Sequence, residues 1–84
     1  MIVEVCTDDI NSIVGIKQSQ VNRVELCSAL ELGGLTPSLS MAETFLTELD
    51  IPIRVMIRPR RGHFTYSEAE LNTMKNDIKV LLLE

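Results

Sequence analysis

Three short apolar segments alternate with three amphipathic segments along this chain of 84 residues, and that alternation restricts the fold more than any other feature. Residues 2–6, 21–27 and 53–58 are rich in Ile, Val and Leu and have the length of buried strands. A helical pattern follows each of them, so the expected order of elements is βαβαβα. Strands that alternate with helices form a parallel sheet with right-handed crossovers, which makes the expected fold class α/β.

Helix start signals precede the amphipathic segments. Thr7 and Asp8 are candidate N-caps for a first helix that runs to about residue 19. The second helix begins near Ser38 or at Ser40, and Ser40 is followed three residues later by a Glu, as in a capping box. Residues 67–70 form a further capping box, which predicts the start of the third helix.

The first two strands end in the same tripeptide pattern, Glu-Val-Cys at residues 4–6 and Glu-Leu-Cys at residues 25–27. Side chains alternate along a strand, so each Glu shares a face with its Cys, and the apolar residues occupy the other face. The third strand has the same two-faced character. The face without Ile and Val carries Glu4, Cys6, Glu25, Cys27, Arg54, Met56 and Arg58.

This two-faced pattern favours a barrel over an open sheet. Helices need an apolar surface to pack on, so the Ile and Val faces should lie under them. A doubly wound sheet would bury the charged face too, whereas the interior of a closed barrel can become polar toward its C-terminal mouth. We therefore expect residues 1–84 to be a single partial domain, the first three units of a (βα)₈ TIM barrel, which has about 250 residues. Its two open sheet edges predict a longer protein or an assembly of copies.

Charge and composition exclude several function classes. The net charge of −4 argues against nucleic acid as a partner. The chain has no apolar stretch of the roughly 18–20 residues that a membrane span needs. It shows no secretory signal, so we expect a cytoplasmic protein whose two cysteines are free thiols or ligands.

The charged face and the loop after the second strand suggest two further kinds of site, one catalytic and one that binds an anion. Glu4, Glu25 and Arg58 are candidate catalytic residues at the C-terminal ends of the strands, or else a buried ion-pair network. Gly33 and Gly34 precede a helix, so their N–H groups, with Arg58 and Arg60, are anion-binding candidates. The alternative for that stretch is an ordinary tight loop between strand and helix.

Two stretches carry a family resemblance. Residues 23–38, RVELCSALELGGLTPS, resemble one signature of the CutC copper homeostasis family. Residues 55–60, VMIRPR, followed by Gly62, Phe64, Tyr66 and Ser67, resemble its second signature. The likeness runs from about residue 2 to residue 78. Arg61 and His63 depart from it, since the family usually has Gly and Asp there, and His63 is left without an assigned role.

The resemblance implies a cytoplasmic TIM-barrel protein linked to copper tolerance, often a homo-oligomer. It also implies that Cys6 and Cys27 are Cu(I) ligands. Soft sulfur donors do select Cu(I), and Met56 adds a third sulfur to the same face. The alternative is that buried Cys and Met fill the core.

Three interpretations of the polar face remain open at this point. The first is a copper-handling protein that binds Cu(I) at the two cysteines. The second is an enzyme acting on a small anionic metabolite, with Glu4 or Glu25 as acid or base. The third is a structural role, in which the polar face serves only the specificity of the fold.

Overall fold

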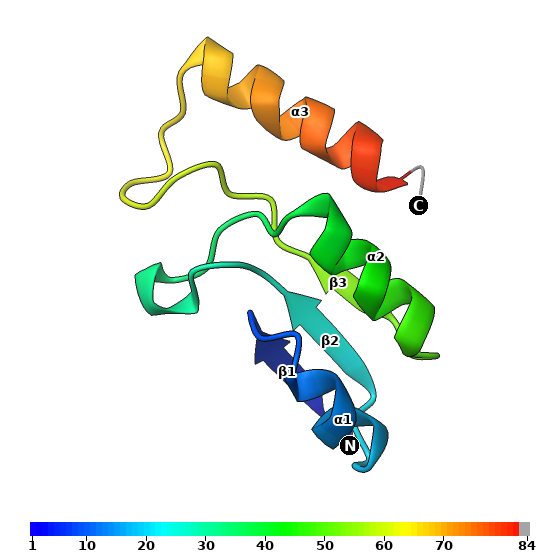
Figure 1. The fold of residues 1–84 in the computed structure, drawn as a ribbon. Coiled ribbons are helices and arrows are strands. Elements are labelled where there is room, and N and C mark those ends of the chain that lie inside the picture. The colour runs from blue at the N-terminus through cyan, green and yellow to red at the C-terminus, as the bar shows by residue number, and fades with distance from the viewer. Residues whose placement is uncertain (83–84) are drawn as a thin grey trace.

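The computed structural model describes residues 1–82. Its elements, in chain order, are β1 (Glu4–Thr7), α1 (Ser12–Lys17), β2 (Arg23–Leu26), the 3₁₀ turn η1 (Leu30–Leu32), α2 (Leu39–Glu48), β3 (Ile53–Val55) and α3 (Glu68–Leu82). The three strands form one parallel sheet in the order β1-β2-β3 (Figure 1). The predicted α/β class and the βαβαβα order are therefore confirmed.

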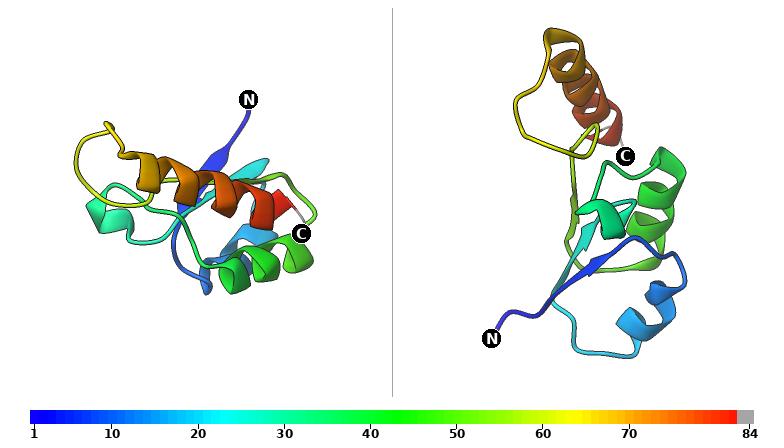
Figure 2. Two further views of the ribbon diagram at one scale, coloured as in Figure 1. Left: turned by 90° about the horizontal axis from the view of Figure 1, so that it is seen from above. Right: turned by 90° about the vertical axis from the view of Figure 1, so that its left-hand side faces the viewer.

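One face of the sheet carries the hydrophobic core. Val24 and Leu26 of β2 are fully buried there, and Phe45 of α2 packs with them. Figure 2 shows α1 and α2 on the same side of the strands. The core contains Ile13, Ile16, Val24, Leu26, Ala42, Phe45 and Leu49. The expectation that the apolar strand faces lie beneath the helices is thus correct.

The strands are shorter than predicted, and β3 shows why. Its expected range was 53–58, but the strand ends at Val55. Met56 still donates its N–H to Leu26 O at 2.9 Å, after which the chain bonds to a loop instead. Arg58 N donates to Thr36 Oγ1 at 2.8 Å, and Thr36 N donates to Arg58 O at 3.0 Å. Thr36 therefore continues the backbone pairing that the sheet no longer supplies.

The first helix starts later than predicted. It begins at Ser12, and neither Thr7 nor Asp8 caps it. Thr7 Oγ1 accepts the N–H of Asp9 at 3.0 Å, and Asp9 Oδ1 accepts that of Asn11 at 2.9 Å. These side-chain bonds stabilise turns that compete with helical backbone, so residues 7–11 stay outside α1.

The helix caps agree with the sequence in one case and differ in the other. Ser38 caps α2 by accepting the N–H of Met41 at 3.1 Å, whereas Ser40 lies inside the helix, so the capping box predicted at Ser40 is wrong. The box at the start of α3 is confirmed. Ser67 N donates to Glu70 Oε1 at 2.8 Å, and Glu70 N donates to Ser67 Oγ at 3.1 Å.

The third helix touches the core only near its end. Leu81 packs against the core cluster, whereas Leu71 and Ile78 on the predicted apolar stripe are exposed. Figure 1 shows α3 lying beyond α2, and a long connection leads to it from β3. That connection holds the arginine-rich loop of residues 58–66.

Two glycines provide a matched test of the fold. Gly15 lies inside α1 and a Cβ there meets open space, so Gly15→Ala should stabilise the protein by roughly 0.5–1 kcal/mol. Gly34 has φ +91°, and a Cβ there would lie 2.7 Å from Met56 Sδ. Gly34→Ala should therefore destabilise the protein by roughly 1–3 kcal/mol. Urea unfolding measures both, and equal effects of the two substitutions would contradict the close packing at Gly34.

Candidate functional site

The face of the sheet opposite the helices is polar. The register places Glu4 beside Arg23, and Cys6 beside Glu25. Glu4 forms an ion pair with Arg23 and lies 3.8 Å from Arg54. The predicted network of Glu4, Glu25 and Arg58 is therefore wrong, because the cations that approach Glu4 are Arg23 and Arg54.

Sequence reasoning missed Arg23, although a signal was present. Arg23 stands two residues before Glu25, so alternation alone puts it on the same face. What the sequence did not give was the register that sets it beside Glu4.

Cys6 lies on this polar face and is exposed. Its thiol donates a hydrogen bond to Glu25 Oε1, with 3.4 Å between sulfur and oxygen. Partial burial, and then the hydrogen bond to Glu25 and the negative charge of that carboxylate, raise the pKa of the Cys6 thiol. Glu25 therefore has a defined partner, and its carboxylate favours the protonated form of the Cys6 thiol.

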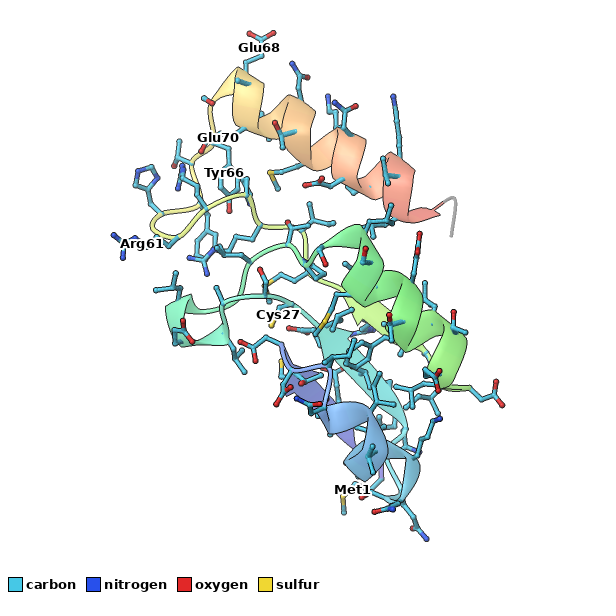
Figure 3. All side chains as sticks on the ribbon, viewed as in Figure 1. Met1, Cys27, Arg61, Tyr66, Glu68 and Glu70 are labelled. Carbon is cyan, nitrogen blue, oxygen red and sulfur yellow. The ribbon has the colours of Figure 1, made fainter. Side chains whose placement is uncertain are left out.

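Cys27 lies just beyond the end of β2 and is fully buried. Its backbone N–H donates to Thr7 O at 3.1 Å, and its thiol approaches the same oxygen at 3.6 Å. Figure 3 shows Cys27 near the end of the strand, beneath the loop that follows it. Burial, and then the charges of Asp8 and Glu25, raise the pKa of the Cys27 thiol.

The two cysteines belong to adjacent strands but are not directly opposite each other. Cys6 pairs with Glu25, so Cys27 is two residues further along. Strand spacing and rise then put their Cα atoms roughly 8 Å apart. That exceeds the ~7 Å limit for a disulfide. The two thiols also have different hydrogen-bond partners, since Cys6 Sγ donates to Glu25 Oε1 and Cys27 Sγ donates to Thr7 O.

The loop after β2 folds back over Cys27. Ser28 and Leu35 exchange two backbone hydrogen bonds of 2.8 Å each, which closes the loop. Within it, Gly33 N donates to Leu30 O at 2.9 Å, and Gly34 N donates to Ala29 O at 3.3 Å. Both amides that were anion-binding candidates are thus engaged inside the loop.

Arg58 joins this loop to the next one. Its Nη1 donates to Gly34 O at 3.2 Å and to Leu32 O at 3.4 Å, and its Nη2 donates to Gly62 O at 3.1 Å. The guanidinium also lies over the Phe64 ring, 5.0 Å from its centroid. Arg58 therefore holds two loops together through their carbonyl groups.

Arg60 organises the second loop. It forms an ion pair with Glu70 and donates to His63 O and Thr65 O, at 2.8 Å each. Its guanidinium lies 5.0 Å from the centroid of the Tyr66 ring. Figure 3 shows Tyr66 and Glu70 close together, beside the loop that carries Arg61. Since Arg60 is fully partnered, its role in binding an anion stays a prediction, as do the catalytic roles suggested for Glu4 and Glu25.

The donor set for a metal ion is small. Within residues 1–82, no three His, Cys, Asp or Glu side chains gather into a metal-binding group. The side chains of Cys27 and Met56 both border Gly34, where an added Cβ would lie 3.5 Å from Cys27 Cβ and 2.7 Å from Met56 Sδ. None of the helices described is long and apolar enough to cross a bilayer.

The partnership of Cys6 with Glu25 can be tested by thiol reactivity. Glu25→Gln removes the negative charge that favours the protonated thiol, so the pKa of Cys6 should fall and its alkylation should shift to lower pH. Iodoacetamide labelling across pH, read by mass spectrometry, measures this. Glu43→Gln on the exposed side of α2 is the control and should leave the profile in place. An unshifted profile in Glu25→Gln would contradict the coupling.

The sequence of this chain is similar to known proteins of one family. The model of the CutC family matches residues 1–82. A CutC family protein of Glaesserella parasuis is 47% identical over 78 residues, which cover 93% of this chain and 32% of that protein. A copper homeostasis protein cutC homolog of Homo sapiens is 43% identical over 82 residues, covering 98% and 30% respectively.

A solved structure agrees with the same relationship. The CutC protein of Streptococcus agalactiae superposes with a TM-score of 0.86 at 36% identity, over 99% of this chain and 41% of that one. The chain thus spans about a third of the length of the curated relatives it matches. With the family model matched over nearly every residue, the chain belongs to the CutC family.

Proposed function

We propose that this protein acts in copper homeostasis and binds Cu(I) as its cargo through Cys6 and Cys27. Relatives in human and mouse are named copper homeostasis protein cutC homologs, and these names are the reason for choosing copper as the metal. The single observation that carries the site is the arrangement of the two free thiols. They stand at the carboxyl ends of two hydrogen-bonded parallel strands, on β1 and just past β2.

The chemistry of the donors fits this cargo. Thiolates and thioethers are soft ligands that favour Cu(I) over hard cations. Met56 and Cys27 both border Gly34, so the thioether is a candidate third donor beside the buried cysteine. Both thiols must lose a proton to bind a metal, and Glu25 already accepts the hydrogen bond of the Cys6 thiol. The negative charge of Glu25, which favours the protonated thiol in the absence of metal, would attract the Cu(I) cation once the proton has left for solvent.

The proposal includes a cytoplasmic location and a homo-oligomeric assembly. Free thiols persist in the reducing cytoplasm, where the buried Cys27 and the exposed Cys6 would stay unoxidised. The net charge of −4 suits a partner that is a cation and not a nucleic acid.

Competition for Cu(I) against a chromogenic chelator tests the site in the intact protein. Cys6→Ser/Cys27→Ser removes both proposed ligands. Loss of a residue that only supports a metal ligand lowers metal affinity roughly 10–100-fold, so the double variant should lose more than that. Met56→Leu should weaken it less. Met41→Leu, the same substitution at a methionine that packs against the core in α2, is the matched control and should have no effect. Unchanged affinity in the double variant would eliminate the site.

A further inference from the structure

A hollow of about 340 Å³ lies beside the loop of residues 58–66, and neither cysteine of the proposed copper site lines it, although Met56 borders both. The first half of α3, the end of β3 and the Gly33 loop enclose it. Its walls are mostly apolar, aromatic or thioether groups. The lining residues are Gly33, Met56, Ile57, Arg58, Phe64, Tyr66 and Met74. A pocket of roughly 300–1,000 Å³ with apolar walls and few polar groups is typical of a small-molecule site.

Arg58 is the cation of this hollow, and it lacks a counterion. Among residues 1–82, Arg58 forms no ion pair, and its Nε atom is buried without a hydrogen-bond acceptor. Neutral carbonyls and the Phe64 ring are its surroundings. A half-buried charge with an unsatisfied donor is costly, so an acceptor that carries negative charge would be bound favourably.

Arg60 shows that this situation is particular to Arg58. The two arginines belong to one loop, and each stacks on an aromatic ring at 5.0 Å. Arg60, however, has the carboxylate of Glu70 as its ion-pair partner. The loop thus contains one arginine with an internal carboxylate and one without, and the one without faces the hollow.

We propose that the hollow binds a small aromatic carboxylate. The carboxylate supplies the acceptor and the counterion that Arg58 lacks, while the ring packs between Met56 and Met74. Methionine sulfur makes favourable contacts with aromatic rings. The Phe64 ring lies against the Arg58 guanidinium. Because this residue is 73% exposed, little packing opposes a rotation of the ring that would admit the ligand.

Methionine methyl resonances provide a direct probe in the intact protein. The chain has four methionines: Met56 and Met74 line the hollow, and Met1 and Met41 do not. Titration with benzoate should shift the methyl signals of the first pair and leave those of the second pair in place. Benzyl alcohol, which keeps the ring but lacks the charge, should bind roughly tenfold more weakly, because a charge-assisted hydrogen bond is lost. Acetate, which lacks the ring, should also bind weakly.

Charge variants identify the responsible group. Arg58→Gln should lose benzoate affinity roughly tenfold or more, whereas Arg61→Gln removes the same charge from the same loop and should not. Cys6→Ser/Cys27→Ser should bind benzoate normally, which separates this site from the copper proposal. The proposal is overturned if benzoate leaves Met56 and Met74 unmoved, or if benzyl alcohol binds as tightly as benzoate. That second comparison uses the natural sequence, so it decides the matter even if Arg58→Gln fails to fold.

Discussion

The central strand β2 is the element on which the rest of the structure depends. It is hydrogen-bonded to β1 on one side and to β3 on the other, and its Val24 and Leu26 are fully buried beneath the helices. Side chains alternate along a strand, so the burial of these two residues forces Arg23 and Glu25 onto the opposite face. The polar face, and with it the partner of the Cys6 thiol, is thus a consequence of core packing.

The loops at the carboxyl ends of the strands are held together mainly by side chains bonded to backbone. Thr36 extends the hydrogen bonding of β3, and the guanidinium groups of Arg58 and Arg60 donate hydrogen bonds to carbonyl groups of the surrounding loops. Loop carbonyls would otherwise lack partners, since neither helix nor sheet satisfies them. Arginine suits this task because its guanidinium offers five donors in one plane. The two arginines differ in their counterions. Arg60 forms an ion pair with Glu70, whereas Arg58 has no carboxylate partner among residues 1–82.

Much of the fold could be predicted from local pattern. The alternation of strands with helices, the apolar face beneath the helices and the capping box of Ser67 and Glu70 are all encoded within a few residues of one another. The errors arose where a local signal had a competitor. Ser40 has the capping pattern, but Ser38 takes the role, and the side-chain turns of Thr7 and Asp9 delay the first helix. The interpretation of Arg58 as a partner of Glu4 failed because β3 ends at Val55, before the arginine is reached.

The sequence by itself determined which side chains share a face, because the period of two along a strand is a local property of the backbone. It also placed both cysteines at strand ends. The tertiary structure alone decided the register, which sets Cys6 beside Glu25 and places Cys27 two residues further on. Register depends on how the helices pack and how the loops close, and these are interactions between residues far apart in the chain. For that reason the offset between the two cysteines along the sheet, and the partner of each thiol, could be determined only from the folded protein.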